Sequence, residues 1–393
     1  MNVLNVCSLI DTVKGGGTGE RTFQMSKYLS LRGLQIEVLA LDIGATQERL
    51  VALAEFGVKG TALPCMNKRY YLPGFVFQII SDAVRRADII HLVGHWDPIN
   101  VITYSYAKRL GKPYVVCPAG STIIFGRSKR IKKLYNLFFG NRILRNADFC
   151  IAVTGSEIKQ FQSYGVRDGR IVVIPNGIHT EISKRNIKID SYPETIGLKD
   201  NPYILFIGRL DVIKGPDLLL DAFSRIESQY PNHHLVIAGP DNGLLTELQM
   251  STKKRGLENR VHFVGFIRGE VKFSAYRDAE LIVIPSRHEA MSIVVLEAGL
   301  AGTPALLTDQ CGLDEIEIIG GGKVVSATAA ALAIGLQEML VDGVQLKKMG
   351  ENLRIHILKK YSWETIVSKY IGLYNDIQTK TVNISSKKDT KKA

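Results

Sequence analysis

The sequence lacks the features that mark secreted and membrane-spanning proteins. No run of residues approaches the apolar length that crosses a bilayer. The N-terminal stretch MNVLNVCSLIDTV has neither a basic region nor a small-residue cleavage site, so we expect no signal peptide. The five cysteines, at positions 7, 65, 117, 150 and 311, show no paired spacing and predict neither disulfides nor a metal site. A reducing cytoplasm is the expected compartment.

Acidic residues are missing where basic ones gather. The net charge is +12, and Arg127–Arg145 holds seven Lys or Arg residues and no acid. The tail from Asp376 holds five Lys and two Asp, so the two stretches carry +10 of the +12. This imbalance predicts an anionic partner. Within Arg127–Arg145 an apolar stripe runs at helical spacing, which fits either a core helix with a solvated face or a helix lying on an anionic membrane. The segment has no nucleic-acid-binding motif.

The 393 residues are enough for two domains with separate cores. Short apolar runs alternate with helical segments throughout, which predicts an α/β fold with parallel, doubly wound sheets. A polar, irregular stretch at 181–200 reads as a linker between domains at 1–180 and 201–360. The basic end, 378–393, is expected to be disordered. The runs expected as strands are Val3–Ile10, Glu37–Leu41, Asp88–Val93, Tyr114–Cys117, Phe149–Val153, Ile171–Pro175, Tyr203–Ile207, His234–Ala238, Val261–Val264, Leu281–Ile284 and Ala305–Leu307.

Two glutamates bracket a turn between a predicted strand and a predicted helix. Glu289 lies in the loop after Leu281–Ile284, and Glu297 lies on the helix that Ser292 is placed to cap and Gly302 to end. Carboxylates bind vicinal hydroxyls, and the helix N-terminus between them offers backbone N–H groups to an anion. The pattern fits the sugar, pyrophosphate and ribose of a nucleotide diphospho-sugar. By spacing alone, two solvated surface glutamates are the preferred interpretation.

Two further strand-to-helix turns contain residues suited to phosphate. Arg209 and Lys214 flank the turn after Tyr203–Ile207 and could neutralise a pyrophosphate, or be ordinary surface cations. The glycine run at residues 15–17 follows the first strand and lets the backbone approach a ligand closely. Its spacing does not match a dinucleotide fingerprint, and a plain flexible turn remains the alternative.

Histidines end the strand at Asp88–Val93. His91 and His95 lie at the carboxyl edge of the predicted sheet, where active-site residues gather, although isolated histidines are often structural. We take both as candidates for the sugar and acceptor side, together with Ser121 in the loop after the next strand.

The stretch from His288 to Pro304, H-E-A-M-S-x-x-x-L-E-A-G-x-A-G-T-P, resembles the signature of the retaining family-4 glycosyltransferases. Gly208–Gly215, G-R-L-x-x-x-K-G, resembles the diphosphate motif of the same family. The resemblance covers residues 1 to 375 and implies the GT-B architecture, in which a last helix, here 361–377, crosses back to the first domain. It implies catalytic roles for Glu289, His95, Arg209 and Lys214. The donor-binding residues that it implies are Gly16, Gly17, Arg209, Lys214, Phe266, Ile267, Glu289, Met291, Ser292, Ile293, Val294 and Glu297.

The chain departs from the family pattern at two places. Val93 stands where the family often has the second histidine of H-x-H, and Ala119 stands where it often has another. Both departures concern the sugar and acceptor side. His95, two residues after Val93, is the nearest substitute for the first.

The expected activity is transfer of a sugar, with retention, from a UDP- or GDP-linked donor to an acceptor hydroxyl. The resemblance implies no metal and no other cofactor. The basic helix favours a lipid-linked acceptor in cell-surface polysaccharide assembly, with the protein peripheral on the inner face of the cytoplasmic membrane. A GT-B nucleotide-sugar epimerase and a non-catalytic basic membrane-binding protein remain alternatives. A glycosidase is less suited, because the two glutamates are expected at opposite ends of the donor.

Overall fold

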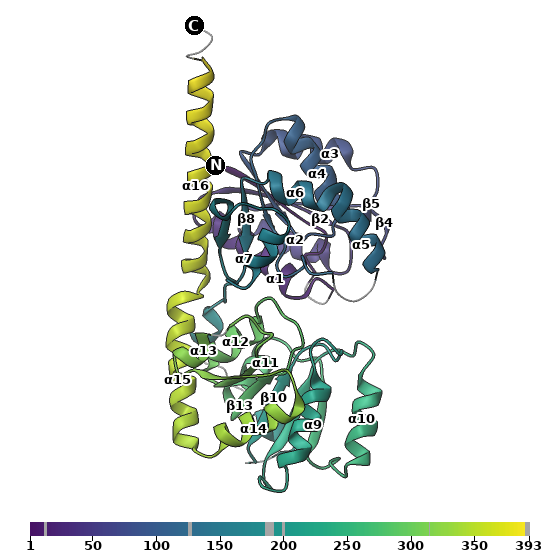
Figure 1. Cartoon of the computed structure of the whole chain (residues 1–393), viewed down its shortest axis with the longest axis vertical. Helices are drawn as coiled ribbons and strands as arrows, with labels where there is room; N and C mark the ends of the chain where they lie inside the picture. Colours follow the sequence, from purple (N-terminus) through teal and green to yellow (C-terminus); the bar gives the residue numbers. More distant parts are fainter. Residues whose placement is uncertain (12–13, 125–127, 185–191, 199–200, 314, 390–393) are drawn as a thin grey trace. The chain divides into compact units, whose positions relative to one another are not determined.

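The computed structural model describes residues 1–393 except 12–13, 125–127, 185–191, 199–200, 314 and 390–393. The chain forms two compact units. The first unit comprises Met1–Gly177 together with the C-terminal segment from Trp363, and the second is the continuous segment Ile178–Ser362 (Figure 1).

The first unit is a parallel sheet of seven strands with helices on its faces. The strand order is β3-β2-β1-β6-β7-β8-β9, and a two-stranded hairpin, β4–β5, lies outside the sheet. Its strands are β1 (Asn2–Cys7), β2 (Gln35–Leu41), β3 (Lys59–Leu63), β4 (Cys65–Asn67), β5 (Leu72–Pro73), β6 (Ile89–Val93), β7 (Tyr114–Cys117), β8 (Phe149–Ala152) and β9 (Ile171–Val173). Its helices are α1 (Gly16–Leu31), α2 (Thr46–Ala54), α3 (Phe77–Arg86), α4 (Pro98–Arg109), α5 (Lys129–Tyr135), the π-helical turn η1 (Asn136–Gly140), α6 (Asn141–Asn146), α7 (Glu157–Ser163), the 3-10 turn η2 (Asp168–Arg170) and α16 (Trp363–Asp389).

The second unit repeats the architecture with six parallel strands in the order β12-β11-β10-β13-β14-β15. These are β10 (Tyr203–Ile207), β11 (His234–Ala238), β12 (Val261–Gly265), β13 (Leu281–Ile284), β14 (Ala305–Thr308) and β15 (Gly322–Val325). The helices are the 3-10 turn η3 (Glu181–Lys184), α8 (Tyr192–Thr195), α9 (Pro216–Ile226), α10 (Leu245–Lys254), α11 (Gly269–Asp278), α12 (Ile293–Ala301), α13 (Glu315–Ile318), α14 (Ala329–Leu340) and α15 (Gly343–Lys360).

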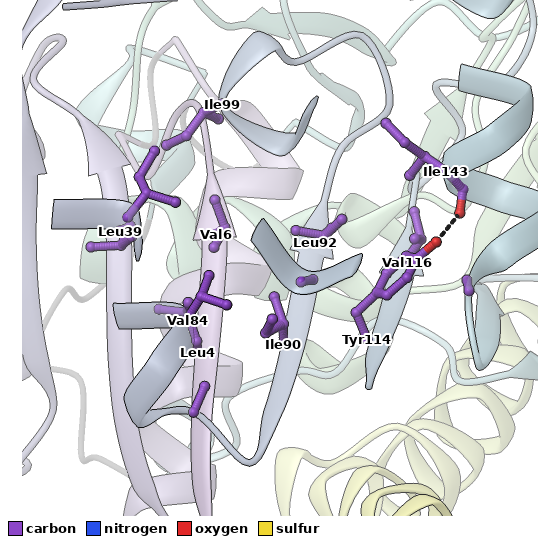
Figure 2. Close-up of a cluster of buried hydrophobic side chains, with 14 of the residues drawn as sticks. Leu4, Val6, Leu39, Val84, Ile90, Leu92, Ile99, Tyr114, Val116 and Ile143 are labelled. Atoms are coloured by element: carbon purple, nitrogen blue, oxygen red, sulfur yellow. Dashed lines mark hydrogen bonds between the residues drawn. The ribbon is translucent and has the colours of Figure 1, made fainter. Parts of the chain in front are cut away.

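Each unit has its own core, built where helices cover a sheet of apolar strands. In the first unit Leu4, Leu92 and Val116 project from neighbouring strands and pack beneath Val84 and Ile143 (Figure 2). The Tyr114 hydroxyl enters this core and donates a 2.8 Å hydrogen bond to the Ile143 carbonyl, so its polar atom is satisfied. The predicted α/β class with two doubly wound parallel sheets is confirmed.

The strand orders locate the likeliest ligand sites by topology alone. In each sheet the chain winds outward in one direction and then in the other, and the reversal lies between β1 and β6 in the first unit and between β10 and β13 in the second. Open α/β sheets bind ligands at the carboxyl ends of the strands beside such a reversal. The loops after these four strands are therefore the candidate ligand-binding loops.

Most central strands fall within a residue or two of their predicted bounds, but the chain ends differently. Helix α16 is assigned as far as Asp389 and so overlaps the tail from residue 378, whose disorder stays a prediction. Residues 390–393 lie outside the described residues. The expected linker, 181–200, groups with the second unit, where the Tyr192 side chain is buried and its backbone N–H donates to Asp278 at 2.9 Å.

Among the described residues no single helix is long and apolar enough to cross a membrane. Helices α14 and α15 reach that length and composition only as a pair bent by 103°.

Candidate functional site

In the second unit, the loops after β10 and β13 meet at the topological reversal. The Lys214 ammonium, after β10, lies 2.8 Å from Oε1 of Glu289, after β13. Both side chains are mostly buried. The proximity that the two motifs predict is therefore observed, although the residues are far apart in sequence.

Glu289 is held from three directions. Its backbone N–H donates to the Gln310 carbonyl at 2.9 Å, and its Oε2 accepts a 3.0 Å hydrogen bond from the Ser286 hydroxyl. A carboxylate oxygen accepts more than one hydrogen bond, so each oxygen of Glu289 retains capacity for a ligand hydroxyl. The orientation of this carboxylate is thus set before any ligand arrives.

The N-terminus of α12 begins three residues after Glu289. Ser292 occupies the N-cap position with an extended backbone, as predicted, and Gly302 ends the helix with φ 85°. The Ser292 side chain makes no capping hydrogen bond, and its hydroxyl is buried without a hydrogen-bond partner among the described residues. Unfilled donors at a helix N-terminus form a site for an anion. Met291 is buried behind this turn, and Ile293 and Val294 form the first turn of α12 and are partly exposed.

Glu297, farther along α12, is paired with α11. Its Oε2 lies 2.6 Å from the Lys272 ammonium and accepts a 2.7 Å hydrogen bond from the Tyr276 hydroxyl. Both partners act on one oxygen, which leaves Oε1 for a ligand hydroxyl. Burial, reinforced by Glu297, raises the pKa of Tyr276 well above its usual value, so the phenol stays a donor.

Arg209 and the loop after β12 lie toward solvent. The Arg209 side chain is half-exposed and lies 3.5 Å from Asp211, which also accepts a hydrogen bond from the Lys214 backbone N–H. Phe266 is exposed, and Ile267 is partly exposed. Asp211 thus links Arg209 to the backbone of Lys214, whereas Phe266 and Ile267 follow β12, which lies two strands from β10 in the sheet.

Arg287 is a residue of this site that its sequence motif did not reveal. Its guanidinium makes two hydrogen bonds to the Asp217 carboxylate, at 2.8 and 2.5 Å, and a third to the Val212 carbonyl at 2.6 Å. Its backbone N–H donates to the Ile213 carbonyl at 2.7 Å. Arg287 thereby fastens the loop bearing Glu289 to the loop bearing Lys214. Its position between Pro285 and Glu289 was the only hint in the sequence.

The glycine run of the first unit forms the start of α1. Gly15 is the N-cap, and a Cβ there would lie 2.5 Å from the Asp11 carbonyl oxygen, so the loop packs too closely for a side chain. Gly16 has φ 53° and would bring a Cβ within 4 Å of no described atom. Gly17 is exposed in the first turn. Gly16 and Gly17 thus border open space at the β1 edge, as a ligand-binding loop requires.

The structure buries both His91 and His95, and their expected roles on the sugar and acceptor side stay predictions. His91 is fully buried, its Nδ1 is 2.9 Å from the Tyr374 hydroxyl of α16, and burial lowers its pKa to about 3. His95 is 2% exposed and enclosed edge-on by aromatic rings, and its Nε2 lies 2.9 Å from Asn136 Oδ1. Burial lowers the pKa of His95 to about 4. Both rings are therefore buried and neutral in this structure.

The edge of the first unit beside the β1/β6 reversal contains a different polar group. Asp97, at the N-cap of α4 beside the β1/β6 reversal, is partly buried. Burial raises its pKa to about 6, and the nearby Ser8 hydroxyl offsets part of that rise. Ser121 is turned inward and donates to the Pro118 carbonyl at 2.5 Å, and Ala119 has φ 49° in the same turn. Asp97 was missed because it belongs to no motif.

Comparison with known families agrees with this geometry. Residues 189–356 match the family model described as glycosyl transferases group 1, and residues 15–182 match glycosyltransferase family 4. The two matches fall on the second and first units, respectively. The chain belongs to the family-4 glycosyltransferases.

The relatives of this glycosyltransferase are moderately similar. An uncharacterised glycosyltransferase of Methanocaldococcus jannaschii is 30% identical over 217 residues, 54% of this chain and 55% of the relative. The D-inositol 3-phosphate glycosyltransferase of Gordonia bronchialis is 28% identical over 392 residues, covering 93% of this chain and 84% of the relative. The match thus spans about half the length of the first relative and most of the second.

A solved structure establishes the architecture. Anabaena HepE in complex with UDP-glucose superposes with a TM-score of 0.78 at 19% identity, covering 96% of this glycosyltransferase and all of HepE. At this level of identity the likeness shows the fold alone, and that fold is GT-B.

Proposed function

We propose that the protein transfers a sugar from a nucleotide diphospho-sugar to an acceptor hydroxyl with retention of configuration. One observation carries the proposal. At the β10/β13 reversal, Lys214 contacts Glu289 beside a helix N-terminus whose capping serine has a buried, unpartnered hydroxyl. A cation, a carboxylate and free N–H groups in one place fit a diphosphate joined to a sugar.

The hard step is the departure of the nucleoside diphosphate, which gathers negative charge as the glycosidic bond breaks. Lys214 and the first turn of α12 are fixed in place and stabilise that charge without rearranging. Arg209 is half-exposed and swings onto the phosphates when they bind. Glu289 holds sugar hydroxyls and so orients the anomeric carbon, while Oε1 of Glu297 accepts from the ribose.

Retention follows if the acceptor hydroxyl attacks from the face that the diphosphate leaves. The departing phosphate oxygen takes the acceptor proton, the new bond forms at the anomeric carbon, and no enzyme nucleophile is needed. Metal independence is part of the proposal, since cationic side chains and helix N–H groups supply the charge that a metal would otherwise provide. We expect activity to persist in the presence of EDTA.

For the donor we favour a UDP-sugar, on the strength of the UDP-glucose bound to HepE, with a GDP-sugar as the alternative. The acceptor we propose is a lipid-linked glycan of cell-surface polysaccharide or lipopolysaccharide assembly. The enzyme would then be peripheral on the inner face of the cytoplasmic membrane. The acid-free basic segment supports this part of the proposal.

A thermal-shift screen with UDP-, GDP- and ADP-sugars tests the donor. Stabilisation by one nucleotide class identifies it, with a shift governed by ligand concentration over Kd. Incubation of that donor with membrane lipid extract, followed by NMR of the anomeric proton in the product, tests retention. An inverted product contradicts the mechanism. Donor isomerisation without acceptor-dependent release of nucleoside diphosphate indicates an epimerase instead.

A further inference from the structure

Helix α5 and the π-helical turn η1 expose a continuous apolar strip. Helix α5 buries none of its residues. The strip is 44% to 64% exposed at each of its large apolar side chains, which are Ile131, Leu134, Leu137, Phe138 and Phe139. A surface helix of a soluble domain normally turns such a stripe toward the core. Here the stripe faces outward, so it does not serve the core of the first unit.

A second exposed apolar segment follows β3. It comprises the β4–β5 hairpin and the loop and first turn leading into α3, residues 65–79. Phe75 is 91% exposed, more than any other large apolar side chain among the described residues. Its exposed neighbours are Met66, Tyr70, Leu72, Phe77 and Ile79. Isolated exposed apolar residues are common, but a run of six in fifteen residues is a patch.

The two segments lie near each other. The Asp97 charge acts on Tyr71 in the hairpin and on Tyr135 at the end of α5, so both segments flank this carboxylate. β5 also packs on α4, whose N-terminus Asp97 caps. Both segments thus lie around the turn that contains Asp97, and Figure 1 shows them on the same side of the first unit in that view. Together they border the carboxyl end of β6, the edge at which the first unit presents its ligand-binding loops.

Charge distinguishes this surface from an ordinary protein interface. Residues 98–147 contain ten Lys or Arg and no Asp or Glu, and residues 65–79 contain Lys68 and Arg69 and no acid. Four of the cations, Lys129, Arg130, Lys132 and Lys133, alternate with the apolar strip of α5. Arg127 lies outside the described residues. Apolar side chains flanked by cations match the boundary between the acyl chains and headgroups of an anionic bilayer.

We propose that α5–η1 and residues 65–79 form one docking surface for an anionic phospholipid bilayer. The apolar side chains enter the headgroup region and the flanking cations pair with lipid phosphates. A second copy of this chain is a poorer occupant, because a two-fold contact would place the same cations against each other. The surface deepens the acceptor part of the proposed function, yet it uses no residue of the donor site.

Vesicle co-sedimentation of the full-length protein tests the surface. We expect binding to vesicles of phosphatidylglycerol and phosphatidylcholine, weak binding to phosphatidylcholine alone, and release at high salt. Lys129→Ala/Lys133→Ala should weaken binding about fivefold per cation. Phe75→Asp and Phe138→Asp should each weaken vesicle binding at least tenfold. Phe75→Asp tests residues 65–79 separately from α5–η1.

Val344→Asp is the matched control, because Val344 is equally exposed but lies on α15 of the second unit. It should bind as wild type does. All variants should keep the wild-type thermal shift with nucleoside diphosphate, so failure of the donor site and failure of the docking surface are separate results. Equal binding to both vesicle types, or unchanged binding by Phe75→Asp and Phe138→Asp, overturns the proposal. A wild-type dimer that Phe138→Asp converts to monomer, without vesicle binding, also overturns it in favour of self-association.

Discussion

At the scale of single residues, the donor site depends on contacts that join distant parts of the sequence. Lys214 and Glu289 belong to motifs that can be read from the chain, and their 2.8 Å contact follows from the parallel topology. Arg287 and Asp217 are 70 positions apart, and nothing in the local pattern of either indicates their bidentate pairing. The motifs thus predicted the residues that are expected to contact the ligand. The residues that hold them in place could be identified only from the structure.

Arg287→Lys should reduce activity more than stability. A lysine keeps the charge but cannot bond both Asp217 oxygens and the Val212 carbonyl at once, so the two site loops lose their fixed spacing. We expect roughly a tenfold fall in kcat/KM and a small change in the melting temperature. Asp217→Asn should behave alike. Arg354→Lys, on the exposed face of α15, is the control. A pure stability loss with unchanged kinetics would contradict this role.

The buried His95 should make stability depend on pH. Its pKa in the folded protein, about 4, is below the ordinary value of 6.5, so the unfolded chain binds more protons between these pH values. Above pH 6.5 the neutral ring makes its full contribution to the free energy of unfolding. As the pH falls from 6.5 to 4, this free energy decreases by about 3 kcal/mol. Asp97, whose pKa is raised, acts in the opposite direction.

Comparison of wild type with His95→Gln isolates this effect, because Asp97 is common to both proteins. Urea unfolding from pH 7.5 to 4 should show a steeper loss for wild type, and the difference between the two slopes is the measurement. Parallel curves would mean that the His95 ring is already protonated in the folded state.

At the scale of elements, prediction succeeded for the central strands and failed for two of the four edge strands, β3 and β15. β7, β10, β11 and β13 are apolar runs buried on both faces, and their bounds were predicted to the residue. β3 (KGTAL) and β15 (GKVV) were missed, because short, half-polar runs with glycine resemble loops until a neighbouring strand pairs with them. Helix α16 runs on to Asp389 from turns that are already packed, so the nucleation cost of its last turns is already met.

Gly215 is a backbone position at which the loops after β10 and β13 approach each other closely. It has φ 69°, and a Cβ would lie 2.1 Å from the Pro285 carbonyl oxygen. Gly215→Ala should destabilise the second unit by at least about 3 kcal/mol, since a left-handed backbone and a clash between the two loops add together.

Gly256→Ala separates the two contributions. Gly256 has φ 70°, but a Cβ there would meet no described atom within 4 Å, so the expected cost is about 1 kcal/mol. Denaturant unfolding monitored by far-UV circular dichroism measures the free energy of unfolding of both variants. Equal costs for the two variants would show that the Pro285 contact relaxes freely.

At the scale of the whole molecule, the two units differ in continuity. Ile178–Ser362 forms the second unit from one segment, whereas the first unit needs α16 from the end of the chain. Trp363, Tyr370 and Tyr374 are buried, and Arg21 donates to the Tyr370 hydroxyl and to the Asn176 side chain at 2.7 Å. The buried Arg21 and His91 would thus be uncovered if α16 were absent.

The fragment 178–362 should consequently fold alone and bind nucleoside diphosphate, while residues 1–177 alone should lack cooperative unfolding. Circular dichroism melts and calorimetric titration of each fragment check this. Supplying a 363–393 peptide should restore cooperativity to 1–177. A cooperative melt of 1–177 without the peptide would contradict the role assigned to α16.

We expect the carboxyl edge at β10 and β13 to hold the diphosphate of the donor by its charge. Calorimetric titration of the wild type and of Arg209→Ala/Lys214→Ala with UDP and with UMP measures this charge-dependent binding. GDP and GMP form the second pair of ligands. The control variant is Lys347→Ala, which changes an exposed lysine of α15. We predict that wild type binds one diphosphate at least tenfold more tightly than its monophosphate, and that the double variant loses this preference. Equal affinity of wild type for diphosphate and monophosphate, or an unchanged preference in the double variant, would contradict the account.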